Sequence, residues 1–450
     1  MPDWVYFHSM ADIRDYLNWR GDLSFDISPL NEVDGLLLSY FSYLDMDECF
    51  RDNQWTFSDE ESEEPSARSK RFVSFHDAVE AFFRTHTEKE IKECRPPFDM
   101  VPYVARQAAS TLRYGSLMIS DYVNLIDPEA VEQMAATVFW IDRDTAFASF
   151  RGTDNTIAGW KEDFSLSYLR ETPGQRHAVE FLDRVFGDPD DPARIYVGGH
   201  SKGGNLAVYS AAYADETVRD RIVSVYANDS PGFRQEIVEG REYRTLLPKI
   251  ISILPESSII GGLLSSAGEN IVIGSTGTGL MQHNPISWEV MGTGFVRGIR
   301  SDLGRFFDDS MRSWLGGLED REMQEFTDAL FSILSAGGAK TLKELRTSPL
   351  KAINEGMQAA MNLSPEKKRE FNAVILRLLK SGIDTLKDQS GEKYTALKER
   401  GEEKVTALRQ DYQAALKGFG EDKNLELKPG PACETSRSEM SGSGKKKKKK

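Results

Sequence analysis

The stretch Gly199-His200-Ser201-Lys202-Gly203 decides the fold that we predict for this chain of 450 residues. The β-branched run Ile195–Val197 comes directly before it, and the alanine-rich helical segment Asn205–Ala214 follows. A serine on a tight turn between a strand and a helix adopts a strained backbone conformation, which flanking glycines permit because they have no side chains to clash. The pattern therefore predicts that Ser201 is a nucleophile. The alternative is a glycine-rich turn with an incidental serine.

Strand-like and helical segments alternate on both sides of this turn. Ala136–Ile141 and Thr145–Phe150 are rich in β-forming residues, Gln175–Phe186 has helical periodicity, and Ile222–Tyr226 and Lys249–Leu254 are two further candidate strands. Alternating strands and helices are typical of a parallel sheet that is covered on both faces. We therefore predict an α/β fold of the α/β-hydrolase type, with a mostly parallel sheet and a C-terminal helical extension.

The chain divides by composition into four parts. Residues 1–295 are predicted to form the α/β-hydrolase-like domain, with a helical lead at the N-terminus and an acidic, solvated loop at 51–70. Residues 296–380 lack strand signals and are predicted to be helical. Residues 381–420 are predicted to form an amphipathic helix, and 421–450 a disordered tail with a polylysine end.

The helix predicted at 381–420 contains an internal repeat. Apolar residues recur every eleven positions, which is close to three helical turns and keeps them on one face; they are Ile383, Tyr394, Val405 and Leu416, and Leu386, Leu397, Leu408 and Phe419. This face favours packing or self-association with another helix over binding to a membrane surface. The tail Lys445–Lys450 is interpreted as solvated, the alternatives being an electrostatic tether or an artificial addition.

Charge and composition exclude several classes of protein. The net charge of −15 repels nucleic acid phosphates, so we expect no nucleic-acid partner. No stretch has the roughly 18–20 apolar residues of a membrane span, and the start of the chain does not resemble a signal peptide. The three cysteines, Cys49, Cys94 and Cys433, show neither a disulfide framework nor metal-binding spacing. We therefore expect a cytoplasmic protein without a metal ion or cofactor.

A second motif lies upstream of the serine. Phe150-Arg151-Gly152-Thr153 ends a β-rich run, and Trp160 and Asp163 follow it; Ser201 comes 48 positions after Thr153. This arrangement resembles the class 3, or fungal-type, lipases. The resemblance implies that Thr153 contributes to an oxyanion hole together with the backbone N–H of Lys202. The alternative for Thr153 is a structural role at a turn.

A closer resemblance covers roughly residues 1–335. The segments Tyr16–Phe25 and Asn31–Asp34, and the turn extended to Gly204-Asn205, are similar to a bacterial group of lipase-like proteins, the Mbeg-type group. The resemblance supports the predicted fold and site, and leaves the substrate open.

A general base must lie within hydrogen-bond reach of the serine, and histidine is the usual residue. The chain has six histidines, and the α/β-hydrolase order of serine, acid and histidine admits only His283, because it alone follows Ser201. The alternative is a histidine in a surface loop. In the Mbeg-type group an aspartate follows this histidine, whereas here Asn284 follows.

The acid that orients the base has two candidates. By resemblance to class 3 lipases it should follow a late strand, and Glu256 stands after the strand Lys249–Leu254. Asp229 ends the preceding strand and ranks second. A third option is a serine or a backbone carbonyl in place of a carboxylate. The alternative for both acids is that they are ordinary loop carboxylates.

These residues predict a serine hydrolase that cleaves a carboxylic ester through an acyl-enzyme on Ser201. Small-molecule or lipid esters as substrates follow only from the resemblance to lipases. The competing interpretation is a protein that retains the fold without catalysis and acts as a scaffold through its C-terminal helices.

Overall fold

The computed structural model describes residues 10–51, 71–93, 100–127, 129–153, 157–191 and 193–335. The chain divides into two units, Met1–Val405 and Thr406–Lys450, and the second lies entirely outside the described residues. The predictions for 52–70, for 336–380, for the repeat helix at 381–420 and for the tail at 421–450 also concern residues outside this range.

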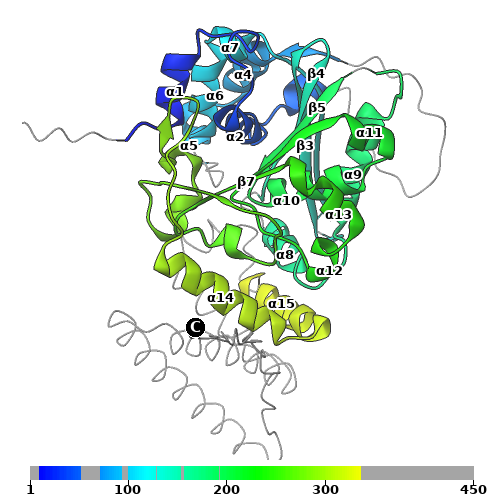
Figure 1. The fold of residues 1–450 in the computed structure, drawn as a ribbon. Helices are drawn as coiled ribbons and strands as arrows, with labels where there is room; N and C mark the ends of the chain where they lie inside the picture. The colour runs from blue at the N-terminus through cyan, green and yellow to red at the C-terminus, as the bar shows by residue number, and fades with distance from the viewer. Residues whose placement is uncertain are drawn as a thin grey trace, which may run out of the picture. The chain divides into compact units, whose positions relative to one another are not determined.

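Eight strands form one mixed sheet, in which every strand lies next to its neighbours in sequence (Figure 1). They are β1 (Val73–Ser74), β2 (Met118–Asp127), β3 (Glu132–Asp142), β4 (Thr145–Phe150), β5 (Arg194–His200), β6 (Ile222–Asn228), β7 (Ile250–Pro255) and β8 (Ile271–Ile273). The first four strands pair antiparallel, and β4 to β8 pair parallel. The carboxyl ends of the five parallel strands therefore meet at one edge of the sheet.

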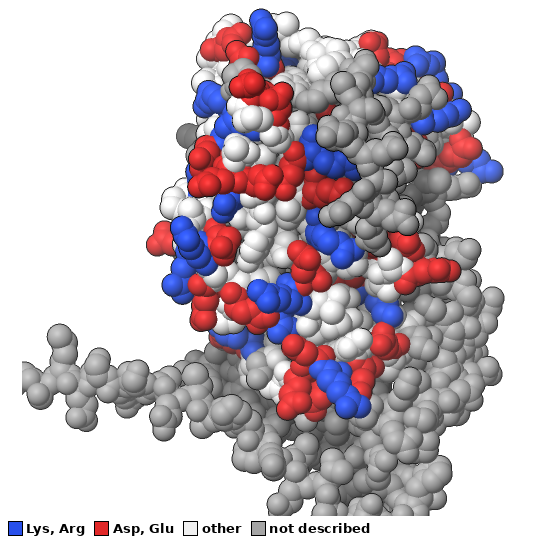
Figure 2. All heavy atoms as spheres, turned by 90° about the vertical axis from the view of Figure 1, so that its right-hand side faces the viewer, with Lys and Arg blue, Asp and Glu red and all other residues white. Residues whose placement is uncertain are grey.

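The helices between parallel strands cover one face of the sheet. They are α8 (Ile157–Ser165), α9 (Pro173–Phe186), α10 (Lys202–Tyr213), α11 (Glu216–Arg221), α12 (Gln235–Val238) and α13 (Arg241–Leu246). Because each parallel strand is placed beside its predecessor, right-handed crossovers put their helices on the same side. Ala146, Ala148 and Phe150 of β4 pack in this core, whereas Phe147 points to the other face. Figure 2 shows positive and negative side chains interspersed on the outer surface of this side.

The opposite face is covered by the N-terminal helices, which are blue to cyan in Figure 1. They are α1 (Ile13–Arg20), α2 (Glu32–Phe41), α3 (Asp47–Phe50), α4 (Phe75–Thr85), α5 (Glu88–Glu93), α6 (Val101–Ala109) and α7 (Leu112–Gly115). Helix α2 packs directly on β5 and β6. A Cβ atom on its Gly35 would lie 2.6 Å from the Tyr226 ring, so only glycine permits this close approach.

A buried ion pair organises this N-terminal layer. The Arg113 guanidinium donates to both carboxylate oxygens of Asp34 at 2.9 and 2.6 Å, and both side chains are fully buried. The hydroxyls of Tyr16 and Tyr114 donate to the same carboxylate. Arg113 also donates to the carbonyl oxygens of Leu23, Ser24 and Ser28. The segments Tyr16–Phe25 and Asn31–Asp34 are therefore tied together by one buried arginine.

The chain continues beyond the sheet with the hairpin of β9 (Val290–Met291) and β10 (Gly294–Phe295), and then with α14 (Asp302–Gly316) and α15 (Asp320–Ser335). Trp314, Met323 and Phe326 form a small core between the last two helices, and Phe164 of α8 packs against it. Within the described residues, no helix combines the length and the apolar character that crossing a membrane requires.

The predicted fold class is confirmed: the protein has an α/β-hydrolase-like, mostly parallel sheet between two layers of helices. We predicted helices on both faces of the sheet because strands and helices alternate along the chain. This explanation is wrong for the face that the N-terminal helices cover. The N-terminal lead covers that face because sequential strand order leaves it without crossover helices. The strands β2 and β8 were not predicted, since polar residues interrupt Met118–Asp127 and Ile271–Ile273 has only three residues.

Candidate functional site

Four of the five parallel strands, β4, β5, β6 and β8, are each followed by one candidate residue at the carboxyl edge of the sheet. Thr153 follows β4, Ser201 follows β5, Asp229 follows β6, and His283 follows β8. In open α/β sheets this edge is where ligands bind. Residues that are far apart in the sequence are therefore brought together here.

Ser201 occupies a strained turn between β5 and α10. Its backbone has φ 59° and ψ −135°, a conformation that is rare for a residue with a side chain. A Cβ atom on Gly199 would lie 2.1 Å from the Gly203 carbonyl carbon, and one on Gly203 would lie 2.1 Å from the Phe150 oxygen. Both glycines are thus required by the tight packing of the turn, which is the geometry of a nucleophile elbow.

Thr153 is fixed beside the elbow by a carboxylate from α8. Its hydroxyl donates to both oxygens of Asp163 at 2.7 Å. Burial raises the pKa of Asp163 to about 7, although the Lys202 ammonium and this hydroxyl act to lower it. Lys202 is the first residue of α10, and the N–H groups of a first helical turn have no partner within the helix. The Lys202 N–H is therefore available as a donor directly after Ser201, and the Thr153 hydroxyl is held by Asp163.

The Lys202 side chain has a separate role that sequence reasoning missed. Its ammonium donates to Glu162 Oε2 at 2.6 Å and to two oxygens of Gln133 at 2.7 and 3.1 Å, and both ionised side chains are 1% exposed. Glu162 also accepts from the N–H groups of Gln133 and Gly174. This satisfied buried pair joins the start of α10 to α8, the helix that carries Asp163.

His283 is bound by Asp229. The distance between His283 Nδ1 and Asp229 Oδ2 is 2.7 Å, and the Asp229 side chain is fully buried. The other carboxylate oxygen of Asp229 accepts from the Ser258 hydroxyl and from the Gly261 N–H. Asp229 has φ 45°, so its backbone turns in the left-handed region directly after β6. Its carboxylate is consequently oriented from several sides toward the imidazole.

Glu256, which sequence reasoning ranked ahead of Asp229, is not placed on His283. Its side chain lies against Gly298, where a Cβ atom would be 2.5 Å from Oε1. The physical reason is strand order: β6 is the immediate neighbour of β5, whereas Glu256 follows β7, one strand further from Ser201. The structure therefore brings Asp229, the candidate ranked second, to His283 and keeps Glu256 apart from it.

The segment around His283 is held by backbone contacts. The Gln282 side chain accepts from the Ser257 N–H at 2.7 Å, and the Gln282 carbonyl accepts from the fully buried Trp288 indole at 2.8 Å. Asn284, where the resemblance to the Mbeg-type group implies an aspartate, accepts from the Ile286 N–H and caps a short 3-10 helix, η5 (Pro285–Ser287). An aspartate could accept the same bond, so this departure preserves the local structure.

Two residues at the site were not predicted. His200 had no assigned role from the sequence, and its fully buried ring lies 4.5 Å from the His283 ring, measured between centroids. Its Nε2 donates to the His283 carbonyl oxygen at 2.9 Å, and its Nδ1 lies 3.2 Å from the Tyr43 hydroxyl. Tyr43 comes from the N-terminal layer, and nothing in the local sequence marks it.

The other described histidines lie apart from the elbow. His76 is exposed beside Asp77, His86 stacks on Phe82, and His177 pairs with Glu132. No three His, Cys, Asp or Glu side chains among the described residues form a group able to hold a metal ion.

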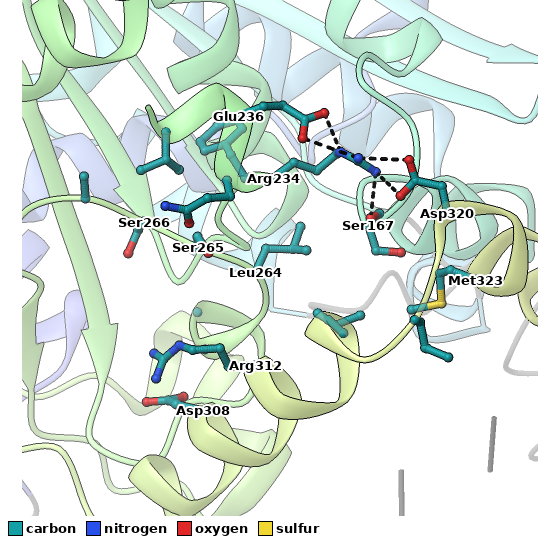
Figure 3. Close-up of a pocket in the computed structure, with 18 of the residues that line it drawn as sticks. Ser167, Arg234, Glu236, Leu264, Ser265, Ser266, Asp308, Arg312, Asp320 and Met323 are labelled. Carbon is teal, nitrogen blue, oxygen red and sulfur yellow. Dashed lines mark hydrogen bonds and ion pairs between the residues drawn. The ribbon is translucent and has the colours of Figure 1, made fainter. Parts of the chain in front are cut away.

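A cavity of about 740 Å³ lies next to the acid side of the site (Figure 3). Its walls include Gly261 and Leu264 from the loop after β7, Arg234 at the start of α12, and Asp308 and Arg312 of α14. Arg234 is bound to Asp320 at 2.7 and 3.0 Å, and both residues line the cavity (Figure 3). Neither Ser201 nor His283 lines this cavity, so it is separate from the elbow.

This chain is similar to a solved lipase structure and to a protein family. The crystal structure of M37 lipase matches with a TM-score of 0.28 and 16% sequence identity, over 39% of this chain and 70% of that chain. A comparison with curated proteins found no match. A family model described as Mbeg1-like matches residues 108–332, half of the chain, and spans the elbow, Asp229 and His283. The chain therefore belongs to the Mbeg1-like family.

Proposed function

We propose that this protein is a serine hydrolase that cleaves a carboxylic ester through an acyl-enzyme on Ser201. The observation that carries the proposal is the 2.7 Å contact between His283 and the buried Asp229, beside a serine in a strained turn. A base that is itself oriented by a third group is the arrangement that activates a serine hydroxyl.

The proposed reaction begins with attack of Ser201 Oγ on the ester carbonyl. His283 Nε2 takes the hydroxyl proton, and Asp229 stabilises the imidazolium through Nδ1. The Ser201 hydroxyl has no hydrogen bond among the described residues, and the contact between base and nucleophile often tightens only when substrate binds. The proton then passes to the leaving alkoxide, and water, deprotonated by His283, releases the acid from the acyl-enzyme.

The negative charge that develops on the carbonyl oxygen requires donors on the opposite side of Ser201. We assign this role to the Lys202 N–H, at the positive end of α10, and to Thr153. The single hydrogen of the Thr153 hydroxyl lies on the Asp163 carboxylate, and it becomes available to the oxyanion when Asp163 is protonated. Small-molecule or lipid esters are the proposed substrates. The cytoplasm is the proposed location, where Cys49, a buried free thiol, would remain reduced.

Turnover of a short-chain nitrophenyl ester by the wild type and by Ser201→Ala tests the proposal, together with labelling by a fluorophosphonate probe. We expect turnover and labelling of the wild type and loss of both in the variant. If the two proteins turn over equally and the probe leaves Ser201 unlabelled, the protein is a non-catalytic member of this fold instead.

A further inference from the structure

His200 is enclosed on three sides by groups that fix its ring. The Tyr43 hydroxyl lies 3.2 Å from Nδ1, the His283 carbonyl oxygen lies 2.9 Å from Nε2, and the Trp288 ring centroid lies 6.1 Å from that of His200. The His200 side chain is fully buried. These contacts hold the His200 ring in one position, next to both the candidate nucleophile and the candidate base.

The contacts determine where the proton of His200 lies. A backbone carbonyl can only accept, so Nε2 must carry the hydrogen, and Nδ1 of the neutral ring then accepts from the Tyr43 hydroxyl. Burial, and secondarily the neighbouring His283, lower the pKa of His200 well below its ordinary value. His200 is therefore a neutral imidazole with one tautomer.

We propose that His200 is a positioning residue for His283, and that Tyr43 acts with it by holding the His200 ring through Nδ1 and its backbone through the carbonyl oxygen, which lies 3.4 Å from the Tyr43 hydroxyl. This inference rests on the proposed function, because it assigns a purpose to placing the base. The peptide group of His283 is anchored directly to His200, the residue that precedes the nucleophile.

The anchor matters because the base belongs to an irregular segment. His283 ends the 3-10 helix η4 (Gly279–His283), and η5 follows immediately. His200, in contrast, is the last residue of the central strand β5 and is adjacent to Ser201. A hydrogen bond from this strand end to the His283 carbonyl makes nucleophile and base move as one unit. Misplacement of a catalytic group by about 1 Å can cost 100-fold in rate.

A neutral His200 also suits the charge that His283 acquires. During the proposed reaction His283 becomes an imidazolium, and its ring centroid is 4.5 Å from that of His200. A second imidazolium at this distance would repel it. The fixed neutral tautomer supplies the hydrogen bond without adding a charge.

Tyr43 makes the N-terminal layer part of the site. It follows α2, which is anchored to the strand ends: the Ser149 hydroxyl donates to the Leu38 carbonyl at 2.9 Å, and the Asn228 side chain donates to the Ser39 hydroxyl at 3.3 Å. The Mbeg1-like family model begins at residue 108, so this contribution lies outside the matched segment. The inference thus predicts that the N-terminal helices affect the rate as well as stability.

The kinetic test uses the full chain with Tyr43→Phe, His200→Phe and His200→Gln. Glutamine can place a donor near the position of Nε2, whereas phenylalanine retains ring volume without a donor. We expect kcat to fall about 10-fold in Tyr43→Phe and about 100-fold in His200→Phe, with KM within about twofold and partial recovery in His200→Gln. Tyr243→Phe is the matched control, because Tyr243 is a buried tyrosine in the opposite layer that accepts from the Ala267 N–H.

A second measurement does not need activity. Nitrogen NMR of the protein labelled at histidine, with His200 assigned from His200→Gln, should show an Nε2–H tautomer that does not titrate between about pH 5 and 8. Tyr43→Phe should disturb this signal and that of His283. A titrating His200, an Nδ1–H tautomer, or a Tyr43→Phe rate equal to that of Tyr243→Phe would overturn the inference. Absence of turnover in the wild type would refute the proposed function, and the NMR result would still decide the placement of His200.

Discussion

The two sides of Ser201 are built by different means. On the base side, His283 is held by hydrogen bonds to Asp229 and His200, and Asp229 in turn accepts from Ser258 and Gly261. On the side that we propose to bind the oxyanion, called the oxyanion side below, Thr153 is held by Asp163, whose helix is joined to α10 by a buried ion pair. Buried charges are expensive to leave unpaired, whereas a network of mostly neutral donors tolerates isosteric change. We therefore expect changes on the base side to reduce rate more than stability, and changes on the oxyanion side to affect both.

The largest expected effect belongs to the base side. Asp229→Asn preserves shape but not charge, so His283 loses the partner that selects its tautomer and stabilises its imidazolium. We expect kcat to fall about 10⁴-fold, with little change in thermal stability. Steady-state ester hydrolysis and a thermal melt measure the two quantities.

The matched control is Glu256→Gln, the carboxylate that follows the next strand and lies against Gly298. It should retain the rate of the wild type. A loss in Glu256→Gln as large as that in Asp229→Asn would show that the geometric assignment of the acid is wrong.

The next effect in size is on stability and belongs to the oxyanion side. Lys202→Met removes the ammonium and leaves the Glu162 carboxylate buried without a cation. We expect the free energy of unfolding to fall by about 3–5 kcal/mol, measured by urea denaturation.

Arg312→Gln provides the comparison, because it removes one partner of the exposed pair with Asp309. Exposed pairs contribute little, so this variant should unfold close to the wild type. Similar losses in both variants would contradict the importance that we assign to burial of the Lys202–Glu162 pair.

The difference between the two sides also explains what could be predicted from sequence. The elbow was predictable because strand, glycines, serine and helix are contiguous, and His283 because chain order left one histidine. The choice between Asp229 and Glu256 could not be predicted from the sequence, because it depends on which strand lies next to β5 in the sheet. Tyr43 carries no local signal, because its contact with His200 joins residues 157 positions apart.

The contribution of the Thr153 hydroxyl is expected to be smaller than that of Asp229. Thr153→Val removes the hydroxyl that Asp163 holds, and we expect kcat to fall about 10- to 100-fold with KM nearly unchanged. Thr153→Ser keeps the hydroxyl and should retain most of the rate. If the valine variant equals the serine variant in kcat, the backbone alone supplies the donors on this side.

The smallest expected effect is a dependence of stability on pH. Burial raises the pKa of Asp163 to about 7, so the folded protein binds a proton there that the unfolded chain releases near pH 4. The folded state binds more protons between these values, and stability therefore falls as pH rises from about 4 through 7. Asp163→Asn removes this dependence of stability on pH, because asparagine does not ionise. Between pH 5 and 8 the wild type should lose about 2–3 kcal/mol more unfolding free energy than the variant.

Protonation of Asp163 also changes the direction of a hydrogen bond. The charged carboxylate accepts from the Thr153 hydroxyl, whereas the protonated form can donate to it and leave the Thr153 hydrogen available for the oxyanion. Asparagine at this position can donate through its amide in the same way at every pH. Unfolding curves of the wild type and Asp163→Asn at pH 5 and 8 measure the change in the free energy of unfolding. An equal decrease in both proteins would show that a group other than Asp163 causes the pH dependence. On the base side, Asp229→Asn tests whether a charged carboxylate is needed. Asp163→Asn tests whether a neutral side chain that can donate a hydrogen bond is sufficient on the oxyanion side.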